Sequence, residues 1–163
     1  MSEPINVDNR PLPWAVRPLQ VVANFAKVYG LRPELVCAVI EQESGWNQWA
    51  VRFEPAFLTR YIHPAIPTAP STLELTKAMS FGLMQVMGET AVEMGFNGKY
   101  LTALCNVTLG IQYGCLKLLR CYARAGGNDR VALQLYNGGG NLSYADEVLA
   151  RVQNYVGKIP ASN

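Results

Sequence analysis

Charged residues and histidine are scarce in this sequence. Only 16% of its 163 residues are charged, the formal net charge is +2, and His63 is the single histidine. The sequence shows no basic stripe of the kind found in nucleic-acid binders, so we expect no nucleic-acid partner. Because histidine pairs and Cys-x-x-Cys motifs are also missing, we expect neither a metal nor a cofactor.

Two kinds of targeting signal are missing as well. The first residues, Met1 to Asn6, show no basic start followed by an apolar run, so we expect no secretory signal. No stretch approaches the roughly 18 apolar residues that a membrane span requires, so we expect no span. These absences predict a chain that is made in the cytoplasm and depends on another factor to reach any target outside it.

The four cysteines lie in apolar segments with helical spacing. Because no secretory signal is evident, we favour buried free thiols over disulfides. The alternative is a catalytic cysteine, which would need His63 beside one of the four cysteines. The cysteines are Cys37, Cys105, Cys115 and Cys121.

Half of the residues are apolar, and their spacing is mostly helical. Residues 1–18 contain four prolines and are expected to form an extended leader. Residues 19–163 are expected to form a single, mainly α domain. A long connection with one short helix is expected over 52–70, and no convincing run of strands is found. Helices are predicted at 19–29, 33–43, 72–79, 89–94, 106–124 (the core helix), 129–136 and 143–156.

Glu43 stands out on the predicted helix 33–43. At about 100° per residue it shares one face with Val39 and Ile40, whereas Glu41 points roughly the opposite way. A carboxyl group on an apolar face loses hydration, and its pKa rises, as a general acid near neutral pH requires. The pattern alone leaves two interpretations open, a catalytic Glu43 and a helix-end Glu43 that bends out to solvent.

The neighbourhood of Glu43 suits a sugar site. It is followed by Ser44-Gly45-Trp46-Asn47, and two further segments, 80–87 and 135–139, place polar side chains beside glycine. Aromatic rings can cover sugar faces, and amide groups can bond to hydroxyl and N-acetyl groups. Trp49 is either a core residue or the floor of such a groove.

Taken in order, these segments resemble the soluble lytic transglycosylase family, whose relatives include goose-type lysozymes. The resemblance runs from about Leu31 to Val156 and implies a lysozyme-like fold, with helices around a long central helix beside a substrate cleft. Two features depart from the family pattern: Gly88 replaces the usual proline, and 52–57 belongs to a longer link than expected. The segments that carry the resemblance are 43–47, 82–87 with Thr90-Ala91, 106–113, 135–139 and Tyr155-Val156.

The resemblance also implies roles for individual residues. Glu43 would be the catalytic acid and base, Ser44 would support its carboxyl group by hydrogen bonding, and the Tyr136 hydroxyl would lie close to Glu43 and the substrate. Four more residues are expected to line or shape the cleft: Gln85, Met87, Asn137 and Tyr155.

The implied activity is that of a peptidoglycan lytic transglycosylase, which cleaves the β-1,4 bond between N-acetylmuramic acid and N-acetylglucosamine and leaves 1,6-anhydro-muramic ends. Peptidoglycan glycan strands would be its partner, and a monomer is expected. The long link is typical of phage and prophage wall-degrading enzymes, which predicts a phage-encoded lysis enzyme or virion component acting on the bacterial wall.

Two alternatives remain. A hydrolytic lysozyme needs a second carboxylate, for which Glu54 is the candidate, with Asp146 and Glu147 behind it. Glu54 could instead form an ion pair with Arg52 or Arg60. A non-catalytic wall-binding or assembly module is the other alternative, and the presence of both Glu43 and Ser44 argues against it.

Overall fold

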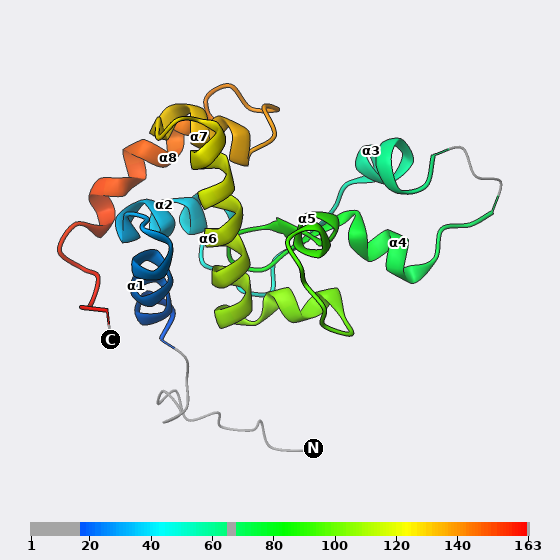
Figure 1. Cartoon of the computed structure of the whole chain (residues 1–163), viewed down its shortest axis with the longest axis horizontal. Helices are drawn as coiled ribbons and strands as arrows, with labels where there is room; N and C mark the ends of the chain where they lie inside the picture. Colours follow the sequence, from blue (N-terminus) through cyan, green and yellow to red (C-terminus); the bar gives the residue numbers. More distant parts are fainter. Residues whose placement is uncertain (1–16, 65–67, 163) are drawn as a thin grey trace, which may run out of the picture.

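The computed structural model describes residues 17–64 and 68–162 (Figure 1). Residues 1–16 of the expected leader lie outside this range. The elements, in chain order, are α1 (Pro18–Tyr29), α2 (Pro33–Ser44), β1 (Val51–Phe53), α3 (Pro55–Phe57), the π-helix η1 (Leu58–Ile62), α4 (Thr72–Lys77), β2 (Met79–Phe81), β3 (Val86–Met87), α5 (Gly88–Glu93), the 3-10 helix η2 (Leu101–Cys105), α6 (Val107–Arg124), α7 (Asp129–Tyr136), α8 (Tyr144–Arg151) and the 3-10 helix η3 (Val152–Tyr155).

The ends of the first two helices follow from proline and glycine. Both α1 and α2 have proline at the first helical position, where the missing N–H costs no hydrogen bond. Both end at a glycine in the left-handed conformation, Gly30 with φ 64° and Gly45 with φ 56°. The predicted end of α2 directly after Glu43 is thereby confirmed to within one residue.

Side-chain caps fix three more helix starts. Ser71 and Glu74 form a capping box at α4, while Asn106 caps α6 and Asn128 caps α7. The expected helices are confirmed there. The last expected helix, 143–156, was too long, because α8 ends at Arg151 and the chain continues as the 3-10 helix η3.

A small sheet corrects the expectation of a chain without strands. Three strands pair antiparallel in the order β1-β2-β3, with Val51 opposite Phe81 and Ser80 opposite Met87. Each strand has only two or three residues, which is too short for the alternation that reveals a strand in sequence. The β2–β3 hairpin contains residues 82–87, one of the segments that carry the family resemblance.

The core lies around α6, as expected. Ile111, Cys115 and Leu118 of this helix are fully buried, and so is the run from Leu35 to Ile40 of α2. Figure 1 shows α6 running through the middle of the body, with α1, α2, α7 and α8 gathered on one side and the sheet and α5 on the other. Helices α3 and α4 project from this body, in the place of the long link.

Close packing at Gly114 joins the hairpin to α6. A Cβ atom at this position would lie 2.2 Å from the Met84 sulfur, so only glycine lets the β2–β3 turn approach the helix. The four cysteines are buried as free thiols, as predicted. Within residues 17–64 and 68–162, no helix combines the length and apolarity needed to cross a bilayer.

Candidate active site

A cleft of about 940 Å³ opens beside the C-terminal end of α2. Its walls come from α2, the link after β1, the β2–β3 hairpin, α5, α6 and the end of α7. It brings together residues that are distant in the sequence. Six of the residues singled out in the sequence line this cleft: Glu43, Glu54, Gln85, Met87, Tyr136 and Asn137.

Glu43 is half-buried in the last turn of α2 and points into the cleft. Burial raises the pKa of its carboxyl group, as the apolar face of the helix predicted. The rise is opposed by a hydrogen bond from Tyr144 and by the positive charges of Lys117 and Arg52. The carboxyl group is therefore held inside the cleft instead of bending out to solvent.

Tyr144 holds the carboxyl group in place. Its hydroxyl donates to Oε1 of Glu43 over 2.6 Å, although the two residues are 101 positions apart. Tyr144 is the first residue of α8 and only 3% exposed, and burial together with the Glu43 charge raises its pKa. Sequence analysis missed it. The available signal was a tyrosine on the same helix face as Val148, where a buried hydroxyl must find a partner.

Tyr136 lines the cleft near Glu43, as expected: burial raises the pKa of its hydroxyl, and the nearby Glu43 charge raises it further. Its hydroxyl donates to the backbone oxygen of Met84 over 2.7 Å, and its side chain is 2% exposed. The Lys117 ammonium lies 3.8 Å from the centre of its ring, in cation–π contact. Tyr136 thus fixes the hairpin turn and seats a lysine in the cleft wall, while the hydroxyl bonded to Glu43 is that of Tyr144.

Gln85 shapes the cleft through its own hydrogen bonds. It lies in the hairpin turn with a positive φ of 45° and is 6% exposed. Its side chain accepts from Ser80 Oγ over 2.8 Å and donates to the backbone oxygens of Ala50 and Gly82. Because these bonds use both ends of the amide, Gln85 stabilises the wall that it forms.

Comparison with known proteins identifies this arrangement. The model of the Transglycosylase SLT domain family matches residues 20–149. The chain belongs to this family. A solved structure of the lytic transglycosylase Slt from Pseudomonas aeruginosa, an inactive glutamate-to-glutamine mutant, matches with a TM-score of 0.60 at 20% identity over 93% of this chain. The chain spans 25% of that protein's length, and the likeness establishes the lysozyme-like fold.

Ser44 of this SLT domain does not bond to the Glu43 carboxyl, which corrects the expected role. Its hydroxyl donates to the backbone oxygen of Leu83 over 2.8 Å and is 3.1 Å from that of Ile40. One position along a helix turns a side chain by about 100°, so Ser44 faces the hairpin while Glu43 faces the cleft. Ser44 supports the carboxyl only indirectly, by tying the end of α2 to the hairpin.

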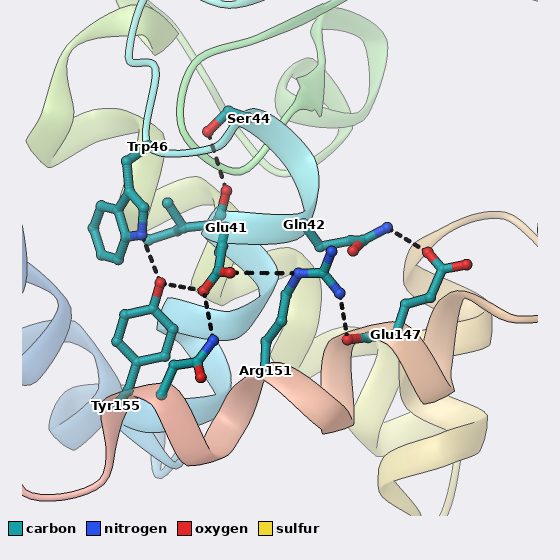
Figure 2. A network of polar contacts seen from close by, with 9 residues as sticks. Glu41, Gln42, Ser44, Trp46, Glu147, Arg151 and Tyr155 are labelled. Atoms are coloured by element: carbon teal, nitrogen blue, oxygen red, sulfur yellow. Dashed lines mark hydrogen bonds and ion pairs between the residues drawn. The ribbon is translucent and has the colours of Figure 1, made fainter.

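Tyr155 does not line the cleft, which corrects the expectation that it shapes the cleft. It lies on η3 beside Glu41 of α2 (Figure 2). Its hydroxyl donates to Glu41 Oε2 over 2.6 Å and accepts from Trp46 Nε1 over 2.7 Å. Arg151 adds an ion pair to Glu41 at 3.6 Å. Glu41 points away from Glu43, as helical spacing predicted, and this network clamps η3 against α2.

Glu54 lies in the cleft and is also paired. Its Oε1 is 2.5 Å from Nε of Arg52, another residue of the cleft wall. The two other carboxylates considered do not line the cleft, since Asp146 pairs with Arg130 and Glu147 accepts a hydrogen bond from Gln42 over 2.7 Å. Glu54 is therefore the one of these three that shares a cavity with Glu43.

Two remaining expectations have plain outcomes. Trp49 is 70% exposed and is neither a core residue nor part of the cleft wall. Within the described part of the chain, no group of three or more histidine, cysteine, aspartate or glutamate side chains is arranged to hold a metal ion.

Proposed function

We propose that this SLT domain is a peptidoglycan lytic transglycosylase, which cleaves the β-1,4 bond between N-acetylmuramic acid and N-acetylglucosamine and leaves 1,6-anhydro-muramic ends. One observation carries the proposal: a desolvated glutamate, Glu43, is held in a cleft by the Tyr144 hydroxyl. Family membership supports it. So does the Slt structure, whose described mutant is inactive after a glutamate-to-glutamine change.

Glu43 would first act as the acid. Burial raises its pKa, so a larger share of the carboxyl group carries a proton near neutral pH. Tyr144 occupies Oε1, while Oε2 has no hydrogen-bond partner among the described residues and can carry the proton into the cleft. As Glu43 protonates the glycosidic oxygen, the bond from this oxygen to C1 of the muramic residue breaks, and the electron pair leaves with the oxygen.

The same carboxylate would then act as the base. It takes the proton from the C6 hydroxyl of the muramic residue, and O6 forms the new bond to C1. The proton balance closes, because Glu43 ends the cycle as it began, and the product is a 1,6-anhydro ring. Since the substrate supplies its own nucleophile, one carboxyl group suffices for the reaction.

Digestion of purified peptidoglycan tests the proposal. Mass spectrometry of the fragments is expected to show muramic ends lighter by one water molecule than reducing ends. The Glu43→Gln variant is expected to bind peptidoglycan but to lose more than about a thousandfold in cleavage rate, since it can neither give nor take the proton. Binding without cleavage by the unmodified protein would contradict the proposal and leave a wall-binding module.

A hydrolytic lysozyme is the second candidate, because Glu54 shares the cleft with Glu43. In that case Glu54 would activate a water molecule or act as nucleophile. Reducing muramic ends, lost in a Glu54→Gln variant, would establish hydrolysis. For the transglycosylase we expect anhydro ends from both the unmodified protein and this variant.

We also propose that the domain acts on the bacterial wall as a phage or prophage lysis enzyme or virion component. The projecting helices α3 and α4, in a link longer than the family pattern leads us to expect, support this. On expression in a bacterium, lysis is then expected only after the membrane has been permeabilised. Lysis upon expression alone would contradict the proposal that the domain reaches the wall only after the membrane has been permeabilised. The expected monomer stays a prediction, which light scattering can test.

A further inference from the structure

Three cationic side chains form a row on α6 along the cleft. Lys117, Arg120 and Arg124 all belong to its wall. At about 100° per residue they fall within roughly 60° of one another around the helix. Apolar residues separate them in the sequence, so no continuous basic run announced them. We call these three residues the α6 cation row.

Among the described residues, no salt bridge joins the α6 cation row to a carboxylate, although Lys117 interacts with the nearby Glu43 charge. Several basic side chains elsewhere are paired, as in Arg32–Asp129, Lys77–Glu89 and Arg130–Asp146. Arg120 and Arg124 are exposed, and their like charges at i and i+4 cost the helix stability. Arg124 offsets part of this cost at the C-terminal end of the helix dipole, but Arg120 and Lys117 lie further from that end.

The inner end of the row is built into the site. Lys117 is seated on the Tyr136 ring, and burial lowers its pKa while the nearby Glu43 charge raises it. Of the acids in the cleft wall, Glu54 is already paired with Arg52, and Glu93 of α5 forms no ion pair with the row. Positive charge therefore extends from the candidate catalytic carboxyl outward along one wall.

The proposed substrate has negative charge that matches such a wall. Its sugars are neutral, and in intact peptidoglycan the lactyl carboxyl of muramic acid is bound in an amide to the stem peptide. The carboxylates of that peptide are then the anions beside the scissile bond. Guanidinium groups bind carboxylates in a bidentate, charge-assisted geometry, which suits the two arginines.

We propose that the α6 cation row binds carboxylates of the stem peptide, so that the domain prefers peptide-bearing glycan strands. This inference rests on the proposed function. Lys117 serves the part of the peptide nearest the sugar, and Arg120 and Arg124 serve the part further out. The row is a specificity determinant, and it takes no part in proton transfer.

Binding in the Glu43→Gln background tests the row without cleavage. The substrates are peptide-bearing strands, the same strands with their carboxylates converted to amides, and strands stripped of peptide by an amidase. Conversion to amides is expected to weaken binding about tenfold, since it removes the charge and keeps the shape. The double variant Arg120→Gln/Arg124→Gln is expected to bind the unmodified strands more weakly by a similar factor. Conversion of the carboxylates to amides is expected to change its binding little.

Two control variants define the comparison. Lys27→Gln removes an exposed charge on α1, outside the cleft, and is expected to behave like the parent protein. Arg120→Lys/Arg124→Lys keeps the charges and is expected to retain most of the preference. If the parent protein binds amidated and unmodified strands equally well, the proposal is overturned. It is also overturned if amidation weakens binding by the double glutamine variant as much as binding by the parent.

The stripped strands separate the two sources of carboxylate, because an amidase leaves the lactyl carboxylate free. Stripped strands that bind as tightly as peptide-bearing ones would assign the row to the lactyl group and overturn the stem-peptide assignment. The products of the active protein are read separately. If the amidation response holds but no anhydro ends form, the proposed activity fails while the carboxylate site stands.

Discussion

At the scale of single residues, two tyrosine hydroxyls form hydrogen bonds with glutamates on opposite faces of α2. Tyr144 donates to Glu43 inside the cleft, and Tyr155 donates to Glu41 outside it. The bonds have the same length, 2.6 Å, and the same chemistry. A comparison of the two phenylalanine variants therefore separates an effect on the candidate catalytic group from a general loss of one hydrogen bond.

Tyr144→Phe is expected to raise the pKa of Glu43 further, because the lost hydrogen bond is one that lowers it. The fall of the cleavage rate with rising pH then moves to higher pH. The maximal rate drops about tenfold, since the carboxyl group loses its fixed orientation. Rates measured across pH check this, with Tyr155→Phe as the control that keeps the parent profile. Identical profiles for the two variants would refute the assignment.

Glu43→Gln is expected to stabilise the fold, with a dependence on pH that follows from the raised pKa. The folded-state pKa lies above the unfolded one, so the charged form is penalised on folding. This cost is absent below the unfolded pKa, grows as the pH rises through the window between the two values, and is complete above the folded pKa.

The glutamine variant avoids this cost. We expect it to gain about 1 kcal/mol, or about 3 °C in Tm for a domain of this size, near pH 8, and nothing near about pH 4. Thermal unfolding at both pH values measures the difference. A gain that is equal at both would show that protonation of Glu43 is not its cause.

At this scale, sequence analysis predicted the buried carboxyl group of Glu43 but not its hydrogen-bond partner. The face of Glu43 follows from the helix period, which is local information. That Tyr144 contacts it depends on how α8 packs against α2, which no spacing in the sequence states. The roles predicted for Ser44 and Tyr155 were wrong for the same reason. A motif gives the order of residues in the chain and not the direction of their side chains.

At the scale of secondary-structure elements, a glycine lets the turn of the β2–β3 hairpin approach its neighbours. Gly82 has φ 71°, and a Cβ atom there would lie 2.4 Å from the backbone oxygen of Leu104. A backbone atom cannot move aside as a flexible side chain can. This turn positions Gln85 and Met87, so its distortion reaches the cleft.

Gly82→Ala is therefore expected to cost about 3 kcal/mol of unfolding free energy and most of the lytic activity. Gly126→Ala is the matched control, with a similar φ of 59° but open space around its Cβ, and is expected to cost about 1 kcal/mol. Urea unfolding measures both. Equal losses would mean that backbone strain alone is at work and that the close contact carries no energy.

Helix ends were the most predictable elements. Proline and glycine fixed α1 and α2, and capping residues fixed α4, α6 and α7, because all of these signals act within a few residues. The sheet and η3 escaped prediction. Strands of two or three residues are stable only through their partners, and the change from α8 to η3 depends on the clamp to Glu41.

Buried thiols provide a probe of the whole molecule. Cys37 and Cys115 are fully buried, and burial raises the pKa of each to about 12, whereas Cys121 lies in the cleft wall. A thiol reacts as the thiolate, so the first two are protected by both burial and protonation. We expect an alkylating reagent to modify Cys121 before Cys37 and Cys115, which react only as fast as the chain unfolds.

Peptide mapping by mass spectrometry after timed labelling checks this order. Urea is expected to release Cys37 and Cys115 together, at the midpoint seen by circular dichroism. Labelling of Cys37 in native conditions at the rate of Cys121 would show that α2 opens separately from α6. The mainly α class was predictable from helical spacing, the lysozyme-like fold from the family resemblance, and the buried thiols from the apolar segments around the cysteines. The α6 cation row required the structure.

The bond between Tyr144 and Glu43 has a consequence for how the protein is made. The glutamate is synthesised 101 residues before the hydroxyl that holds it, and the walls of its cleft are added one after another in between. A nascent chain therefore carries the acid long before it has an enclosed site to use it in. The proposed capacity to cleave peptidoglycan therefore becomes complete only late in synthesis, after α8 has been made and packs onto α2.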